Sequence, residues 1–277
     1  MLLFTSKIDL QEFLNKLNEK KVGFVPTMGG LHEGHLQLIK SSINQCDITV
    51  CSIFINPTQF NNSEDFSNYP SSLDSDLDKL KVLGCDAVYN PQSDDLYEDK
   101  ISSKKFDFGT LTNYMEGKFR PGHFNGVATI VEKLFNIIQP SIAFFGEKDL
   151  QQLQIIKALT KHMNSSISIK SIPTVRENNG LAKSTRNKRL SKQAQEEAAE
   201  IYRCLSYCKK NKNQGIRQLK KQVVQKIINN KNLELEYIEF VDLESMTPIK
   251  KWGETNKNAI CIAAYHSGIR LIDNIIL

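Results

Sequence analysis

Two histidines, His32 and His35, stand three residues apart in the stretch PTMGGLHEGH, which joins an apolar segment to a helix-forming one. At the end of a buried strand, a helix N-terminus offers N–H groups and the positive end of its dipole to an anion such as phosphate. Gly29 and Gly30 let the backbone turn tightly and approach such a ligand. Both imidazoles could donate to phosphate oxygens and stabilise charge on an α-phosphate and on departing pyrophosphate. The stretch therefore predicts a phosphate site that serves a transfer reaction.

Gly34, between the two histidines, would let a nucleotide lie close to the start of the helix. A glycine-rich turn with two surface histidines is the structural alternative, but the strand-to-helix junction favours the phosphate interpretation. Metal binding by the H-x2-H pair is a still less favoured interpretation, because no further Cys/His cluster supplies the missing ligands.

A second group of chemical residues lies in FFGEKDLQQ, residues 144–152, again between a strand and a helix. Gly146 permits close approach, Lys148 supplies a mobile cation, and Asp149 could cap the helix or accept from a ribose hydroxyl. The alternative for Lys148 and Asp149 is a surface ion pair.

A third group lies in GLAKSTRNKRLS, residues 180–191, where Ser184, Thr185 and Arg186 stand together in a loop that begins with glycine. Hydroxyls beside an arginine suit a triphosphate, and the alternative is a solvated loop. Three such loops at one edge of one predicted sheet favour a nucleotide site over three unrelated loops.

The elements that position these loops alternate between strand and helix, which predicts a Rossmann-like α/β fold: a parallel sheet covered by helices on both faces. The predicted strands are 22–28, 47–56, 86–91, 141–146 and 166–175. The predicted helices are 9–20, one that starts at the second histidine, 71–84, 123–139 and 149–163. An Asp9–Glu12 capping box begins the first helix, and Gly84 ends the third.

After about residue 190 the pattern changes to that of a smaller α+β domain. Polar helices are expected near 191–210 and 213–230, and strands at 233–242, 258–265 and 269–276, the last two joined at the turn HSG. We therefore expect two domains, 1–180 and 181–277.

The charge is distributed unevenly along the chain. Residues 1–185 carry 19 Lys and Arg against 21 Asp and Glu, a net charge of −2, whereas residues 186–277 carry 17 against 10, a net charge of +7. A basic third of this kind is compatible with nucleic acid, with an anionic small substrate or with a solvated surface, and the last is the default.

The composition is that of an ordinary globular protein of 277 residues, for which two domains are the ceiling. No apolar run approaches the roughly 20 residues that span a bilayer, so no membrane segment is expected. The start, MLLFTSKIDLQEF, lacks the basic leader and cleavage site of a secretory signal, and the six cysteines are scattered. We expect reduced thiols and a cytoplasmic location.

Five blocks in order resemble the pantoate–β-alanine ligase (pantothenate synthetase) family of the nucleotidyltransferase superfamily. PTMGGLHEGH is similar to the HxGH signature, FINPTQF to the pantoate loop, and the others are RPGHFNGVATIV, GEKDLQQ and PTVRENNGLAKSTRNKRLS. An HxGH alone would indicate only a nucleotidyltransferase or a tRNA synthetase. The resemblance implies an ATP- and Mg²⁺-dependent ligase that joins (R)-pantoate to β-alanine through an enzyme-bound pantoyl adenylate, releasing pantothenate, AMP and pyrophosphate.

The same resemblance implies roles for individual residues. His35 matches the proton donor, and His32, Lys148 and Arg186 would act with it on the phosphates. Expected ATP contacts are Met28, Gly29, Gly30, Leu31, His32, Glu33, Gly34, His35, Gly146, Glu147, Lys148, Asp149, Val175, Lys183, Ser184, Thr185 and Arg186. Expected contacts to pantoate and β-alanine are Gln59, Gln152, Pro26, Met28, His123 and Val127.

Two positions depart from the family pattern. Gly30 stands where the family usually has alanine, and Lys183 replaces a methionine, which puts an apolar contact to adenine in doubt. Mg²⁺ is expected to be held mainly by ATP phosphates and water, without assigned protein ligands. Asp74 and Asp76 are candidates, and we interpret them as capping and surface acids at a helix start.

Three other functions compete with this one. A tRNA synthetase or RNA-binding relative would explain the basic third, but that segment is short and has no basic-aromatic platform, so no nucleic acid partner is expected. An adenylyltransferase or cytidylyltransferase is disfavoured by FINPTQF and the Gln152 block, and a noncatalytic nucleotide-binding protein by the full set of chemical groups. The resemblance also suggests a homodimer, and Gly180 predicts a hinge that lets 181–277 act as a lid over ATP.

Overall fold

The computed structural model describes residues 1–97 and 100–277, which form two compact units. The first unit comprises Met1–Phe108, Arg120–Glu147 and Ile155–Pro173, and the second comprises Gly109–Phe119, Lys148–Gln154 and Thr174–Leu277. Each unit has its own sheet and its own apolar core.

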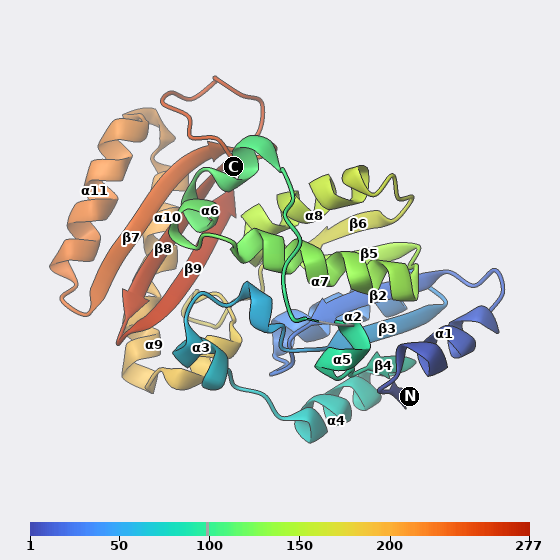
Figure 1. The fold of residues 1–277 in the computed structure, drawn as a ribbon. Coiled ribbons are helices and arrows are strands. Elements are labelled where there is room, and N and C mark those ends of the chain that lie inside the picture. The colour runs from blue at the N-terminus through green and yellow to red at the C-terminus, as the bar shows by residue number, and fades with distance from the viewer. Residues whose placement is uncertain (98–99) are drawn as a thin grey trace. The chain divides into compact units, whose positions relative to one another are not determined.

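The sheet of the first unit has six parallel strands in the order β1-β4-β3-β2-β5-β6. Figure 1 labels strands β2 to β6 of this sheet. Its strands are β1 (Leu2–Phe4), β2 (Val22–Thr27), β3 (Ile48–Ile53), β4 (Ala87–Tyr89), β5 (Ile142–Gly146) and β6 (Ser168–Ile172). The predicted parallel sheet is confirmed, and the unpredicted β1 adds an edge strand beside β4.

Helices cover both faces of this sheet because β2 carries apolar side chains on each. Val25 packs in one core cluster with Leu38 and Ile39 of α2, whereas the ring of Phe24 meets that of Phe135 on α7 at 6.3 Å between centroids. Figure 1 shows α7 and α1 on one side of the strands and α2 on the other. The unit's helices are α1 (Lys7–Asn15), α2 (Glu33–Ile43), α3 (Ser63–Ser67), α4 (Leu73–Leu83), α5 (Ser93–Leu96) and α7 (His123–Ile138).

Two helix starts differ from the prediction. The side chain of Ser6 accepts from the N–H of Ile8 and begins α1, so the predicted Asp9–Glu12 capping box is wrong. Helix α2 begins at Glu33 with His32 as its N-cap, two residues before the expected start. Gly84 ends α4 in the left-handed conformation, as its position predicted.

The second unit is built on an antiparallel sheet in the order β7-β8-β9. Its elements are α6 (Met115–Phe119), α9 (Lys192–Ala198), α10 (Glu200–Lys210), α11 (Ile216–Asn229), β7 (Leu233–Asp242), β8 (Asn258–His266) and β9 (Ile269–Ile276). Helix α8 (Leu150–His162) begins in this unit and continues in the first. The predicted helix 191–210 is divided at Ala199, and the three predicted strands are confirmed.

Within residues 1–97 and 100–277, no helix combines the length and the apolar character that crossing a bilayer requires. The six cysteines are free thiols, five of them buried.

Candidate active site

The loop between β2 and α2 contains the PTMGGLHEGH stretch, and two of its glycines have backbone angles that side chains disfavour. Gly29 has φ = 79° and Gly30 has φ = 63°, both in the left-handed region. The chain can therefore leave the end of β2 and enter α2 within five residues. This placement matches the strand-to-helix junction that the sequence predicted.

The two histidines form a capping box at the start of α2. His32 Nδ1 accepts from the N–H of Gly34 at 3.1 Å, and His35 Nδ1 accepts from the N–H of His32 at 3.3 Å. The rings lie 4.1 Å apart, and a Cβ on Gly34 would stand 2.8 Å from His32 Cε1. Because each Nδ1 serves as an acceptor, a neutral ring carries its proton on Nε2. Each imidazole is thus fixed as an Nε2–H donor.

Asp76 lies beneath this loop, and the surface position expected for it is wrong. Its side chain is 1% exposed, and its carboxylate accepts from the N–H of Gly30 at 2.7 Å and of Leu31 at 2.8 Å. Lys79 Nζ lies 3.6 Å from Asp76 Oδ1 and donates to the carbonyl of Leu31 at 3.0 Å. Asp74, by contrast, is exposed on the first turn of α4.

Three of the residues predicted to bind pantoate, Gln59, Met28 and His123, contact one another through Gln59. The side-chain Nε2 of Gln59 donates to Met28 Sδ at 2.8 Å. The backbone carbonyl of Gln59 accepts from His123 Nδ1 at 2.8 Å. Arg120 Nη1 lies 3.0 Å from His123 Nε2, and because a guanidinium only donates, that nitrogen must accept. The proton of His123 is therefore on Nδ1, which makes it the donor to Gln59.

Sequence reasoning missed two residues that hold Gln59 in place. Asn56 is 1% exposed, and its amide nitrogen donates to Gln59 Oε1 at 3.2 Å and to the carbonyl of Gly126 at 3.1 Å. Its oxygen accepts from the buried hydroxyl of Tyr97 at 2.7 Å. Burial raises the pKa of Tyr97, which keeps that hydroxyl protonated. Asn56 lies within FINPTQF, which was the available signal, whereas nothing in the sequence pointed to Tyr97.

Gly126→Ala tests how closely α7 approaches this turn. An added Cβ would stand 2.3 Å from the carbonyl oxygen of Thr58, so one backbone segment must move. We expect the free energy of unfolding to fall by about 1–3 kcal/mol and the KM for pantoate to rise. Urea unfolding and initial rates measure the two effects, with the exposed Asn136→Ala of the same helix as the control. Wild-type values for both would contradict the close approach.

The remaining predicted residues of the first unit lie on its regular elements. Pro26 is half-buried in β2, and Val127 is buried on α7. Gly146 ends β5, and Glu147 Oε1 accepts from the hydroxyl of Ser171 at 3.0 Å.

In the second unit, Lys148 lies in a 3-10 turn, Glu147–Asp149, that precedes α8. Its Nζ is 3.5 Å from Asp149 Oδ1, so the ion pair considered as an alternative is present. Asp149 directly precedes Leu150, the first residue of α8. The carbonyl of Lys148 accepts from Asn274 Nδ2 of β9 at 2.9 Å. The backbone of the lysine is therefore fixed by a residue 126 positions further along the chain.

Val175 and Lys183 are brought side by side, because the N–H of Lys183 donates to the carbonyl of Val175 at 2.9 Å. The ammonium of Lys183 donates to Glu177 at 2.8 Å, so the charge introduced at this position has an acidic partner. Ser184 accepts from the N–H of Arg186 and caps the following 3-10 turn, while Thr185 is 3% exposed.

Arg176, next to Val175, anchors this segment to β9. Its guanidinium donates to both carboxylate oxygens of Asp273 at 2.6 and 3.0 Å and stacks on the ring of Tyr202 at 3.7 Å. Burial raises the pKa of Asp273 even though Arg176 opposes that shift. Adjacent residues of β9, Asp273 and Asn274, thus hold the Val175 segment and Lys148.

Gln152 is half-buried on the first turn of α8. Its neighbour Gln151 holds this turn in place through its side-chain amide. Gln151 is 4% exposed and donates to the carbonyls of Leu111 and Tyr114 at 2.7 and 2.9 Å. It also accepts from the N–H of Glu116 at 2.9 Å.

Arg270 of β9 binds the carboxylate of Glu116 with two hydrogen bonds of 2.7 and 2.8 Å, and it also contacts Glu236. The hydroxyl of Tyr237 donates to Glu116 at 2.7 Å. Burial alone would lower the pKa of Arg270, but the bonds and charges of Glu116 and Glu236 raise it above its ordinary value. This buried network ties α6 to β7 and β9.

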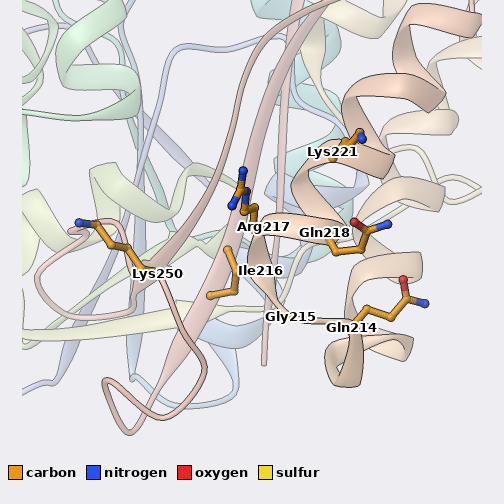
Figure 2. A pocket seen from close by; sticks show the side chains of 7 residues that line it. All are labelled: Gln214, Gly215, Ile216, Arg217, Gln218, Lys221 and Lys250. Carbon is orange, nitrogen blue, oxygen red and sulfur yellow. The ribbon is translucent and has the colours of Figure 1, made fainter.

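A hollow of about 550 Å³ lies at the start of α11 (Figure 2). It is lined by Gln214, Gly215, Ile216, Arg217, Gln218, Lys221 and Lys250. None of the predicted site residues is among them. Arg217, Lys221 and Lys250 are exposed, so the hollow forms part of the basic surface of residues 186–277.

Within the part of the chain that the structure describes, no group of three or more His, Cys, Asp or Glu residues could hold a metal ion. Both oxygens of Asp76 already accept backbone N–H groups, and the Lys79 ammonium lies beside them. The donor set therefore does not fit a protein-held Mg²⁺ at Asp76.

Comparison with known proteins assigns the chain. A family model described as pantoate-beta-alanine ligase matches residues 3–276. The chain belongs to the pantoate–β-alanine ligase family. The pantothenate synthetase of Flavobacterium psychrophilum is 43% identical over 100% of both chains, and that of Christiangramia forsetii is 44% identical over 100% of this chain and 99% of that one.

Solved structures agree with this assignment. Pantothenate synthetase from Thermus thermophilus superposes with a TM-score of 0.93 at 33% identity, covering 99% of each chain. The pantoate-β-alanine ligase of Francisella tularensis, solved in complex with beta-gamma ATP and β-alanine, has a TM-score of 0.85 at 36% identity, covering 100% of this chain and 97% of that one. The predicted family, fold class and enzyme class are confirmed, and the match over the whole chain excludes the tRNA synthetase and nucleotidyltransferase alternatives.

Proposed function

We propose that this ligase condenses (R)-pantoate with β-alanine at the expense of ATP, through an enzyme-bound pantoyl adenylate, and releases pantothenate, AMP and pyrophosphate. The match of residues 3–276 to the pantoate–β-alanine ligase family carries the proposal. The two imidazoles held as Nε2–H donors at the start of α2 support it chemically.

In the first step, a carboxylate oxygen of pantoate attacks the α-phosphorus of ATP, and the bond from that phosphorus to the pyrophosphate oxygen breaks. Negative charge grows on the pyrophosphate, where His32 and His35 donate hydrogen bonds and Lys148 and Arg186 supply positive charge. Val175, Lys183, Ser184 and Thr185 belong to the proposed ATP-binding set. The protein mainly positions the reactants and neutralises charge, and forms no covalent bond to them.

In the second step, the amine of β-alanine attacks the acyl carbon of the adenylate, the bond to the AMP oxygen breaks, and the amine loses a proton. Adenylation makes this possible because AMP is a far better leaving group than oxide. We place Gln59 and Gln152 against pantoate, since amides bind hydroxyls and carboxylates without adding charge. Pro26, Met28, His123 and Val127 would pack against its gem-dimethyl group.

The reaction is tested with pantoate labelled with oxygen-18 in its carboxylate, together with ATP and β-alanine. One labelled oxygen should appear in AMP, because the attacking oxygen stays on phosphorus when the amine displaces AMP. No AMP should form without pantoate. Unlabelled AMP, or AMP formed without pantoate, would rule out the adenylate route.

Gln59→Ala should act mainly on substrate binding. The side-chain amide of Gln59 is held by Met28 and Asn56. In the proposed reaction this amide contacts pantoate before as well as during the chemical step, so its loss weakens substrate binding. We expect the KM for pantoate to rise about 10-fold, the effect of one or two lost hydrogen bonds, with AMP formation recovering partly at high pantoate. The exposed Asn68→Ala is the control. A low rate that persists at saturating pantoate would contradict a binding role.

We further propose that Mg²⁺ accompanies ATP, that the ligase acts as a homodimer and that it works in the cytoplasm. The proposal of Mg²⁺ rests on its usual coordination by phosphates and water. The homodimer rests on the family resemblance, and the cytoplasmic location rests on the similarity to bacterial biosynthetic enzymes. The domain boundary after residue 180 and the lid motion of 181–277 stay predictions.

A further inference from the structure

A carboxylate outside the PTMGGLHEGH stretch occupies two backbone donors of its loop. Asp76, on α4, is 1% exposed, and one of its oxygens accepts from Gly30 N–H while the other accepts from Leu31 N–H. Hydrogen bonds to an ionised acceptor are the strong ones, and 2.7 and 2.8 Å are lengths typical of them. These two N–H groups therefore hold a protein side chain.

We propose that Asp76 is a positioning residue of the ligase: it fixes the loop from which His32 and His35 act on the nucleotide. The inference rests on the function proposed above. Gly30 and Leu31 directly precede His32, the N-cap of α2. Fixing the N–H groups of these two residues therefore also fixes the position of His32. Lys79 completes the arrangement by donating to the Leu31 carbonyl.

The close contact beneath Gly29 shows that this fit is tight. A Cβ on Gly29 would stand 3.1 Å from both Asp76 Oδ2 and Ile53 Cγ2, so the loop lies directly on the carboxylate and on β3. A left-handed loop of two glycines has few contacts of its own to hold it, because glycine has many accessible conformations. The buried carboxylate supplies the missing constraint.

Asp76→Asn replaces one acceptor oxygen by an NH₂ group that faces another donor. We expect the single-turnover rate of pantoyl-adenylate formation at saturating ATP to fall about 100-fold, the loss that a misplacement of about 1 Å causes. Backbone amide exchange at Gly30 and Leu31 should become faster in the ligand-free enzyme. Asp78→Asn, exposed on the same helix, should change neither quantity.

Three results would overturn the inference. The first is a normal rate of adenylate formation in folded Asp76→Asn, and the second is unchanged amide exchange at Gly30 and Leu31. The third is a rate in Asp76→Asn that is restored by raising Mg²⁺, which would make Asp76 a metal ligand instead. Should Asp76→Asn fail to fold, Asp76→Glu keeps the charge on a longer stem and should give a smaller loss of rate, and wild-type activity there would also count against positioning. A wild-type enzyme that forms no adenylate would refute the proposed function, while the exchange measurement would still decide the role of Asp76 in the loop.

Discussion

His35→Ala is expected to lower the rate of pantoyl-adenylate formation by about 100-fold or more while leaving the KM for pantoate nearly unchanged. His35 presents an Nε2–H donor, because its Nδ1 accepts from the N–H of His32. A donor aimed at charge that develops during the reaction stabilises the transition state more than the substrate, and losing one such donor typically costs roughly 10²–10³ in rate. Lys148→Ala should behave in the same way. Single-turnover measurement at saturating ATP and Mg²⁺ separates this step from later ones.

Two further substitutions separate catalysis by His35 from its part in the capping box. In His35→Asn, the amide oxygen can take the place of Nδ1 and accept from His32 N–H, but nothing replaces the Nε2–H donor. In His35→Gln, the amide nitrogen can reach the place of Nε2 and donate. We expect His35→Asn to fold normally and stay slow, and His35→Gln to recover part of the rate. If the rate of adenylate formation recovered in His35→Asn but not in His35→Gln, the role of His35 would be capping alone.

Arg270→Leu is expected to lower the free energy of unfolding of the second unit by about 3–5 kcal/mol. The change leaves the carboxylates of Glu116 and Glu236 buried without their counter-charge, and removing one partner of a buried pair costs about that much. Trp252, the single tryptophan, packs against the core of this unit, so its fluorescence during urea unfolding reports the transition.

A matched control for Arg270 is Lys220→Met, which breaks a more exposed pair with Glu239. That pair should be worth less than about 1 kcal/mol, since water already screens both charges. Equal losses from the two substitutions would show that the buried network contributes packing only.

The sequence predicted the fold because its strongest signals are local. Apolar β-branched runs gave the buried strands, and β7 and β9 were predicted with the bounds that the structure has. The three-residue β1 carries no such pattern, and only its pairing with β4 makes it a strand. The break at Ala199 lacks a glycine or proline that would have signalled it.

The candidate site could be predicted only where its chemistry is contiguous in the chain. PTMGGLHEGH and GEKDLQQ are recognisable by their residue types, so His32, His35 and Lys148 could be proposed as site residues from the sequence. Asp76 was misjudged, because its spacing at a helix start is that of any surface acid and only tertiary packing buries it. Asn274 acts on Lys148 over 126 residues, a separation at which no local pattern exists.

That long separation has a consequence for synthesis of the enzyme. When Lys148 has been added to the growing chain, the residue that binds its carbonyl is still 126 residues away. At roughly 5–20 residues per second, about 6–25 s pass before Asn274 is made. During this interval the His32–His35 loop and its partner Asp76 are already complete, while the lysine segment lacks its anchor. In a nascent chain, therefore, both members of the contact between Asp76 and the histidine loop exist before the residue that anchors the lysine segment has been made.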